Sequence, residues 1–566
     1  MSRSAWIFIA ACVSTLSGGF AIQPHSGHQM RMRDGIRLAT NVFRPPGDGR
    51  VPAILVRTPY GKGTGIPRGL SEFVAHGYAV VVQDVRGRYD SEGVFDPLDQ
   101  EGPDGDDTLN WIARQPWSDG NVGMAGGSYL GIVQWKAALT GNPHLKAIFP
   151  MVSGDDDYFD RFYSRGGALK LGHRLLWFSW NLRAPGFLAP PFSAFTSSLP
   201  LRTADLVATG RTVRSWQQAL NHPMYDDFWN RLSVREHMDR VHVPVFSAGG
   251  WYDNYVESDL DAFTALGAVP EHPEHHIVIG PWAHNMTSKF GAIDFGPGSS
   301  TAAMNGIELA WFDRWLKGVA SPTASAPMRI FVMGVNDWRD ESEWPLARTR
   351  YTDLYLDSLG AANSLNGDGS LSWTQPLTPT ADRFTYDPAK PVPTNGGAVC
   401  CSPSVFRWGP MDQGPVEKRR DILVYTSPLL DHDLEVIGPV KVILYASTTA
   451  PDTDFTAKLV DVFPSGEARN LCDGILRLRY RDGLDHVAKT SPGETYALTI
   501  PAGVTSNVFL RGHRIRLEIS SSNFPRFDRN PNTGRPIADE TGTLTANQTV
   551  RHGRDFPSHI VLPVVK

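Results

Sequence analysis

The residues Val122-Gly123-Met124-Ala125-Gly126-Gly127-Ser128-Tyr129-Leu130-Gly131 place one serine in a glycine-rich turn between two apolar segments. A serine at a sharp turn from strand to helix projects its hydroxyl above the sheet, and the crowded backbone there requires glycine neighbours. The shorthand for this nucleophile elbow is G-x-S-x-G, whereas the last glycine here falls one position later, at Gly131. The stretch predicts a nucleophilic Ser128, with an ordinary glycine-rich loop as the alternative.

The segments around this turn alternate between strand and helix patterns. The pattern predicts strands at 36–43, 53–57, 78–83, 121–125, 243–248 and 277–279, and helices at 104–115 and 130–140. An aromatic-rich stretch interrupts the alternation, and short segments with period two and frequent Gly and Pro fill the last part of the chain. We predict an α/β core at 24–155 and 236–347, a helical cap insertion at 156–235 and a C-terminal β-sandwich (jelly roll) at 348–566.

A serine hydroxyl is a poor nucleophile near neutral pH, so Ser128 requires a base within reach and an acid that orients the base. Asp253 and His284 each lie on a loop just after an apolar strand. Their order along the chain, nucleophile then acid then histidine, is the order used with a nucleophile elbow. We therefore predict Ser128, Asp253 and His284 as a catalytic triad.

Neighbouring histidines and aspartates are less suitable as the base and the acid of the triad. His275 and His276 precede their strand, at the wrong edge of the sheet. Asp259 and Asp261 fall in the helix after the Asp253 loop, where we expect them to face solvent.

Acyl transfer also requires hydrogen-bond donors for the oxyanion that develops on the substrate. One predicted donor is the backbone N–H of Tyr129, the residue after the nucleophile. The second donor should come from the loop after an early strand, where Tyr60 is the candidate through its phenolic hydroxyl. From spacing alone, a tyrosine that only packs in this loop is an equal alternative.

Composition excludes some classes of partner. The chain has 566 residues, 54 Lys and Arg, 59 Asp and Glu and a net charge of -5, with no basic stripe for a phosphate backbone. We therefore expect no nucleic-acid partner. The 16 Trp and 43 Pro are typical of a protein with many loops and aromatic-lined clefts, the setting of a small-molecule site.

The N-terminus has the layout of a secretory signal peptide. Arg3 precedes the apolar run 5–13, and the small residues near Ala21 fit a cleavage site. We predict a signal peptide at 1–21 and export to the periplasm or the extracellular space. The alternative is an uncleaved extension of a cytoplasmic enzyme. No other stretch of the sequence reaches the length of about 18 apolar residues that spans a bilayer.

Export would remove Cys12 and leave Cys400, Cys401 and Cys472. Adjacent Cα atoms lie about 3.8 Å apart, closer than in usual disulfides, so a bond between Cys400 and Cys401 would be strained. We expect small buried thiols rather than a redox or metal site.

Beyond these patterns, nearly the whole mature chain resembles a family of serine hydrolases. The family includes cocaine esterases, X-Pro dipeptidyl-peptidases, α-amino acid ester hydrolases and some glutaryl-cephalosporin acylases. The motifs that carry the resemblance are Arg57-Thr58-Pro59-Tyr60, Gln83-Asp84-Val85-Arg86-Gly87, Ser91-Glu92-Gly93, Gly126 to Gly131, Gly250-Trp251-Tyr252-Asp253, Gly280-Pro281-Trp282-Ala283-His284, 452–462 and 520–525. The cocaine esterase branch is the most similar.

The resemblance implies the roles of nucleophile, acid and base for the predicted triad, and an oxyanion hole formed by the Tyr60 hydroxyl and the Tyr129 N–H. It also implies that aromatic residues contact the acyl group, and Phe162, Trp177 and Tyr255 are the candidates. One departure is the pair of small thiols at positions 400 and 401, where that branch has bulky apolar residues near the site.

We expect a serine hydrolase without cofactor or metal that acts on small-molecule carboxylic esters, with amides as an alternative. A peptidase or α-amino ester hydrolase would need carboxylates facing the substrate ammonium, and the run Asp155-Asp156-Asp157 is the candidate. A glutaryl acylase would need a cation, from Arg161 or Arg165. A carbohydrate-binding β domain is a further alternative, and a homodimer is left open.

Overall fold

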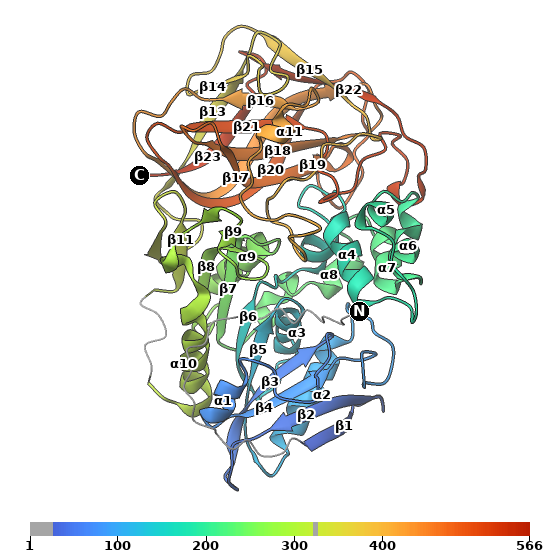
Figure 1. Ribbon diagram of the computed structural model, residues 1–566, viewed down its shortest axis with the longest axis vertical. Coiled ribbons are helices and arrows are strands. Elements are labelled where there is room, and N and C mark those ends of the chain that lie inside the picture. The colour runs from blue at the N-terminus through green and yellow to red at the C-terminus, as the bar shows by residue number, and fades with distance from the viewer. Residues whose placement is uncertain (1–25, 321–325) are drawn as a thin grey trace.

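The structure is a computed structural model that describes residues 26–320 and 326–566 (Figure 1). The described chain forms two large β-sheets and a group of short helices. The C-terminal sheet lies at the top of Figure 1 and the N-terminal sheet lies below it. The predicted signal peptide at 1–21 lies outside the described residues.

The N-terminal sheet has ten strands in the order β1-β2-β4-β3-β5-β6-β7-β8-β11-β12. Pairing is parallel from β4 through β11 and antiparallel at both edges. The strands are β1 (Ser26–Arg31), β2 (Arg37–Phe43), β3 (Val51–Thr58), β4 (Ala79–Asp84), β5 (Ser118–Gly127), β6 (Leu145–Met151), β7 (Val245–Tyr252), β8 (His275–Ala283), β11 (Met328–Val332) and β12 (Asp337–Glu341). Because parallel strands end at one edge, the loops after β5, β7 and β8 meet there.

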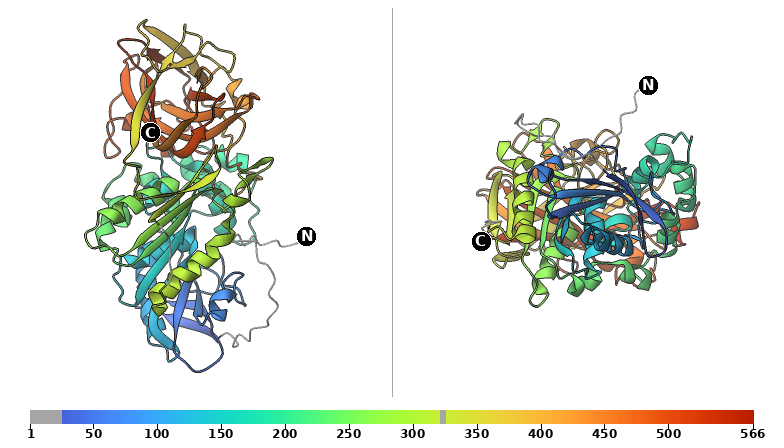
Figure 2. Two further views of the ribbon diagram at one scale, coloured as in Figure 1. Left: turned by 90° about the vertical axis from the view of Figure 1, so that its left-hand side faces the viewer. Right: turned by 90° about the horizontal axis from the view of Figure 1, so that it is seen from below.

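Helices cover the N-terminal sheet on both faces (Figure 2). They are α1 (Ser71–Ala75), α2 (Glu101–Ala113), α3 (Tyr129–Ala138), α9 (Val256–Ala268) and α10 (Met304–Lys317). Every residue of β4 is buried, as expected for a central strand covered on both sides. Its valines join α1, α2, α3 and α10 in one apolar core. Two short strands, β9 (Lys289–Phe290) and β10 (Ile293–Asp294), form a separate hairpin.

The insertion between β6 and β7 is helical and lies beside the upper edge of the sheet (Figure 1). It contains a π-helical turn at Tyr158–Phe162, α4 (Leu171–Asn181), α5 (Phe192–Thr196), α6 (Ala204–Thr209), α7 (Arg214–Asn221) and α8 (Asp227–Leu232), with 3₁₀ segments at Leu201–Thr203 and Arg235–Arg240. Its aromatic side chains mostly pack with one another, around Trp216 and Trp229.

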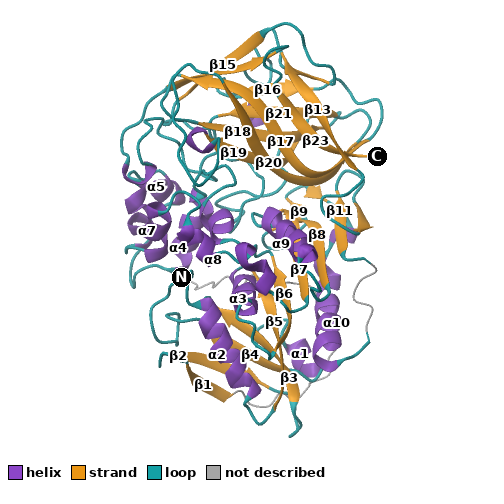
Figure 3. Ribbon diagram, turned by 180° about the vertical axis from the view of Figure 1, so that it is seen from behind, coloured by secondary structure: helices purple, strands orange, loops and turns teal. Residues whose placement is uncertain are grey.

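The C-terminal domain is a mostly antiparallel sheet of eleven strands, seen from behind in Figure 3. The strands are β13 (Thr349–Asp357), β14 (Ser370–Ser372), β15 (Thr380–Tyr386), β16 (Leu423–Thr426), β17 (Leu434–Thr448), β18 (Asp454–Val462), β19 (Ala468–Arg477), β20 (Tyr496–Phe509), β21 (Arg514–Ser520), β22 (Ala546–His552) and β23 (His559–Val565), with one short helix, α11 (Gly414–Glu417). Its core continues into the apolar residues of β8, α9 and β11, so the two domains share buried surface.

The predicted fold class is confirmed: an α/β core carries a helical insertion and is followed by a β domain. The longest helix among the described residues, α10, has 14 residues, and none has the length and apolar character needed to cross a membrane.

Candidate active site

Ser128 occupies the sharp turn between β5 and α3. Its backbone has φ 58° and ψ -125°, a conformation that residues other than glycine rarely adopt. The Ser128 N–H donates to the carbonyl of Met151 on the neighbouring strand β6 at 2.8 Å. This geometry fixes the hydroxyl at the carboxyl edge of the sheet.

The glycines around the elbow are needed for close approach. A Cβ at Gly126, whose φ is +123°, would lie 2.7 Å from the Cβ of Leu130. A Cβ at Gly131 would lie 2.5 Å from the Cβ of Ser153. The second crowded position is therefore residue 131, which explains why the glycine falls one place later than in the shorthand.

The three residues predicted as a triad lie together. Asp253 follows β7 and His284 follows β8. The Nδ1 atom of His284 lies 2.7 Å from Oδ1 of Asp253, and Nε2 lies 2.9 Å from Oγ of Ser128. Asp253 is fully buried and His284 keeps 15% of its side chain exposed. The imidazole thus bridges a buried carboxylate and a hydroxyl through opposite nitrogens, as proton transfer from the serine requires.

The Tyr60 hydroxyl lies beside the nucleophile. It lines the same pocket as Ser128, and it accepts a hydrogen bond from Nε1 of Trp177 at 3.1 Å. Burial of the hydroxyl raises the pKa of Tyr60, so the phenol stays protonated near neutral pH and is able to donate. Tyr129 is the first residue of α3, where a backbone N–H has no acceptor within the helix. Both predicted oxyanion donors therefore lie at the site.

The side chain of Tyr129 is held by contacts that the sequence did not predict. Its hydroxyl donates to Glu101 at 2.6 Å, and Glu101 forms an ion pair with the buried Arg57 at 2.8 Å. The Tyr129 ring also stacks on Trp177, with centroids 6.1 Å apart and planes 6° apart. These contacts fix the residue that follows the nucleophile.

A pocket of about 320 Å³ opens at Ser128, and two of the three predicted acyl-contact residues line it. Its lining consists of Tyr60, Ser128, Tyr129, Ile132, Arg161, His173, Arg174, Trp177, Tyr255 and Cys400. Phe162 is not in this lining and instead packs 5.1 Å from the guanidinium of Arg174. Within residues 26–320 and 326–566, no three His, Cys, Asp or Glu side chains are grouped to hold a metal ion.

The expectation of two free thiols at 400 and 401 was wrong. Cys400 and Cys401 form a disulfide, with their Cα atoms 3.7 Å apart. Cys400 lies in the wall of the pocket. Cys472 is a free, buried thiol.

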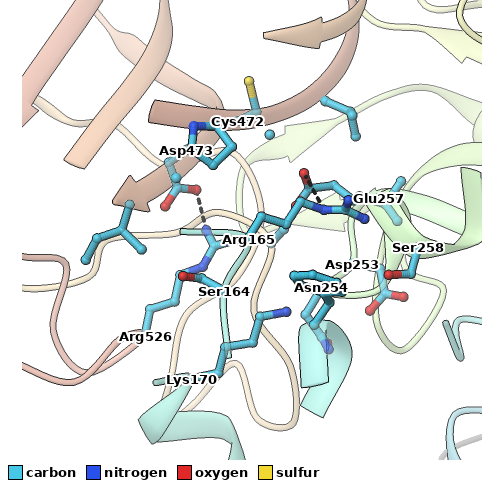
Figure 4. Close-up of a pocket in the computed structure, with 18 of the residues that line it drawn as sticks. Ser164, Arg165, Lys170, Asp253, Asn254, Glu257, Ser258, Cys472, Asp473 and Arg526 are labelled. Carbon is cyan, nitrogen blue, oxygen red and sulfur yellow. Dashed lines mark hydrogen bonds and ion pairs between the residues drawn. The ribbon is translucent and has the colours of Figure 1, made fainter. Parts of the chain in front are cut away.

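A second cavity, of about 620 Å³, has Asp253 in its lining (Figure 4). Arg165 lines it and forms ion pairs with Glu257 at 3.1 Å and with Asp261 at 2.6 Å. Ser128 is not in the lining of this cavity. Arg165 is therefore separated from the nucleophile and already neutralised, which removes it as the cation of a glutaryl site.

The acidic run 155–157 does not supply carboxylates to the pocket. Asp155 pairs with Arg235 at 2.7 Å, and Asp157 pairs with Lys136 at 2.7 Å. Asp156 accepts a hydrogen bond from Ser233 at 2.5 Å. All three are buried and none lines the pocket at Ser128, because they anchor the start of the insertion.

Asp259 also differs from expectation, since it is 3% exposed rather than facing solvent. It accepts a hydrogen bond from the N–H of Gly154 at 3.0 Å. Burial and the nearby charge of Asp253 raise the pKa of Asp259 well above its ordinary value.

A second serine, aspartate and histidine lie together inside the β domain, at Ser358, Asp382 and His552. The Ser358 hydroxyl is 2.8 Å from the Asp382 carboxylate and 3.0 Å from Nε2 of His552, and the same Nε2 is 3.1 Å from Asp382. Nε2 therefore contacts both partners, while Nδ1 is buried without a hydrogen-bond partner, so the imidazole does not bridge the serine and the aspartate through opposite nitrogens. The three residues are at most 5% exposed, and we interpret them as a structural network.

Comparisons with known proteins agree with this geometry. Family models for the X-Pro dipeptidyl-peptidase (S15 family) and for the X-Pro dipeptidyl-peptidase C-terminal non-catalytic domain match residues 34–286 and 321–561. The cocaine esterase of Rhodococcus sp. (strain MB1 Bresler) is 42% identical over 94% of this chain and 97% of that protein. The chain belongs to the cocaine esterase and X-Pro dipeptidyl-peptidase family. It is a serine hydrolase of the α/β-hydrolase fold, as the sequence motifs implied.

Two solved structures cover the whole chain. An aminopeptidase from a marine sediment archaeon, Thaumarchaeota archaeon, and an α-amino acid ester hydrolase each align over 100% of both chains with a TM-score of 0.84 and 26% identity. These two proteins therefore share the fold of this chain over its full length.

Proposed function

We propose that this protein hydrolyses carboxylic esters through an acyl-enzyme on Ser128. The observation that carries the proposal is the position of His284, within 2.9 Å of the Ser128 hydroxyl and 2.7 Å of the Asp253 carboxylate. His284 takes the proton of the hydroxyl while Oγ bonds to the acyl carbon. It then gives that proton to the leaving alcohol as the ester bond breaks.

The second half of the reaction reverses these roles. A water molecule gives a proton to His284 while its oxygen bonds to the acyl carbon. His284 then gives that proton to Oγ of Ser128 as the bond between Oγ and the acyl carbon breaks, which releases the carboxylic acid and restores Ser128. In both halves the Tyr60 hydroxyl and the Tyr129 N–H donate to the negative oxygen of the tetrahedral intermediate. Asp253 stabilises the imidazolium that forms in each step.

Ester hydrolysis is favoured over peptidase activity by the charge of the pocket. A substrate ammonium requires a carboxylate beside it, whereas the lining of the pocket at Ser128 contains two arginines and no Asp or Glu among the described residues. The identity to the Rhodococcus protein named a cocaine esterase also supports esters.

Tyr60→Phe tests the oxyanion hole. We expect kcat for p-nitrophenyl butyrate to fall about 100- to 1000-fold, because one of two oxyanion donors is lost while the ring remains. KM should change little, since the donor acts on the intermediate. Trp177→Phe, which removes the hydrogen bond to the Tyr60 oxygen and keeps an aromatic ring, is the matched comparison, with a smaller expected loss of about tenfold. A Tyr60→Phe enzyme with unchanged kcat would remove this residue from the mechanism.

We also propose that residues 1–21 direct export of the enzyme. The apolar run 5–13 and the small residues before Ala21 support this. Expression of the full chain followed by N-terminal sequencing of the exported fraction is expected to show a new terminus near residue 22. An intact N-terminus on active protein in the cytoplasm would contradict the proposal.

A further inference from the structure

A disulfide joins Cys400 to Cys401 at the wall of the pocket that contains Ser128. Of the two, Cys400 lines the pocket, and 5% of this residue is exposed. Cys401 is half-buried and packs against the apolar core of the insertion, and its Sγ lies 3.9 Å from the carbonyl oxygen of His173 on α4. The disulfide therefore lies between the pocket and the insertion, with Cys401 as its more exposed member.

The two cysteines belong to a loop of the β domain that reaches the insertion. The base of the loop is closed by two backbone hydrogen bonds between Gly397 and Gly409, of 2.8 and 3.0 Å. After the cysteines, Phe406 is buried and packs on Phe192 of α5, with ring centroids 5.6 Å apart. These contacts hold the loop on both sides of the disulfide and do not depend on it. Cleavage of the bond between the sulfurs should therefore change the pocket wall without unfolding the domain.

The disulfide adds little to the stability of the fold. A disulfide stabilises mainly by closing a loop in the unfolded chain, and the effect grows with the number of residues in that loop. Cys400 and Cys401 are adjacent in sequence, so their bond leaves the rest of the unfolded chain unconstrained. A role in the pocket is thus favoured over a role in stability.

We infer that this disulfide undergoes reversible exchange with small thiols, and that its reduction lowers the esterase activity at Ser128. An incoming thiolate bonds to Sγ of Cys401, and the bond between the two cysteine sulfurs breaks to release the Cys400 thiolate. A second thiolate then attacks the sulfur of the bound thiol, which releases Cys401 and forms the disulfide of the small thiol. The protons of the two small thiols end on Cys400 and Cys401. The effect on activity rests on the proposed ester hydrolysis.

The surroundings of Cys400 favour its release as a thiolate. Arg174 lines the same pocket, and although burial lowers its pKa to about 10, the guanidinium stays charged at neutral pH. A nearby cation stabilises a thiolate, and a more stable thiolate leaves faster. Cys401 is the more exposed member of the pair, so a small thiol reaches its sulfur more readily than the sulfur of Cys400.

Reduction should impair catalysis because it frees part of the pocket wall. With the bond intact, the two side chains hold each other in one arrangement, whereas two thiols take up separate side-chain positions. A displacement of about 1 Å at an active site is able to lower a rate about a hundredfold. We therefore expect reduction to lower kcat/KM about fivefold or more.

The test follows thiol content and activity in one sample of the full wild-type chain. The protein would be reduced with dithiothreitol and then freed of it by gel filtration without oxygen, because free thiols cleave p-nitrophenyl esters themselves. We expect iodoacetamide to label neither Cys400 nor Cys401 before reduction and both after it. Over the same step, kcat/KM for p-nitrophenyl butyrate should fall about fivefold or more. Treatment with oxidised glutathione should restore the disulfide and the activity together.

Two variants locate the effect. The double variant Cys400→Ser with Cys401→Ser lacks the bond, so its kcat/KM should equal that of the reduced wild type and should not respond to dithiothreitol. Cys472→Ala is the matched control, because it removes a free buried thiol that is not in the lining of the pocket at Ser128. It should show the wild-type activity and the wild-type fall on reduction. The wild-type measurements stand alone if the double variant does not fold.

Four results would overturn the inference. Labelling of both cysteines before reduction would show that no disulfide is present to exchange, and failure of dithiothreitol to reduce the pair would show that thiols do not reach it. Complete reduction with kcat/KM changed less than twofold would separate the pair from activity. A response to dithiothreitol in the double variant would place the effect elsewhere.

The proposed function has a separate outcome. An oxidised wild type that hydrolyses no p-nitrophenyl ester would contradict ester hydrolysis at Ser128. The labelling of Cys400 and Cys401 would still test the exchange with thiols in that case.

Discussion

Ser128→Ala is expected to lower kcat for p-nitrophenyl esters by about a millionfold, to the level that binding and the oxyanion donors provide alone. The reason is geometric. The hydroxyl lies 2.9 Å from Nε2 of His284 and lines the same pocket as Tyr60. Substrate binding should persist, because the substitution removes one atom and leaves the pocket lining in place.

Ser358→Ala is the matched control for this experiment. It also removes a hydroxyl that contacts an aspartate and a histidine, but the network is closed inside the β domain. We expect full activity and a lower melting temperature, since the buried Asp382 loses a hydrogen-bond donor. Loss of activity in Ser358→Ala with retention in Ser128→Ala would reverse the assignment of the two serines.

Asp253→Asn is expected to lower kcat about ten-thousandfold with little change in KM. The carboxylate accepts from Nδ1 of His284 at 2.7 Å, so Nε2 is left free to accept the Ser128 proton. An amide in that place favours the other tautomer and cannot stabilise the imidazolium. The pre-steady-state burst of p-nitrophenol should disappear along with turnover, because acylation itself becomes slow.

Asp259→Asn provides the comparison for the second prediction. Asp259 is a buried carboxyl that accepts a hydrogen bond from the Gly154 N–H, and an amide of the same shape leaves the hydrogen bond between Asp253 and His284 in place. We expect kcat within tenfold of the wild type. An Asp259→Asn enzyme that loses as much activity as Asp253→Asn would show that either carboxyl can orient His284, which contradicts the assigned geometry.

The sequence predicted the parts of the site that follow from chain order and local backbone shape. Ser128 is marked by a turn that only glycines permit, and Asp253 and His284 are marked by their places after successive strands. Parallel strands bring these loops to one edge of the sheet, so the order of the strands alone predicts that residues far apart in the chain meet there. Tyr60 needed the resemblance to a known family, because spacing left its role open.

Other features depend on which side chains meet after folding, and these the sequence did not predict. Arg174 has the pattern of one more residue of an amphipathic helix, and its place in the lining of the pocket at Ser128 is visible only in three dimensions. The run at 155–157 is buried against cations from distant segments, such as Lys136 and Arg235, rather than exposed. Asp259 is buried because its helix packs against the sheet beside Asp253, which a charge pattern alone does not reveal.

The most direct test of the central claim is to locate the acylated residue. The wild-type enzyme would be incubated with a fluorophosphonate, digested and examined by tandem mass spectrometry. We predict one stoichiometric adduct, on Ser128, that is absent from Ser128→Ala and unchanged in Ser358→Ala. An adduct on Ser358 or on any other residue, or undiminished labelling of Ser128→Ala, would contradict the account.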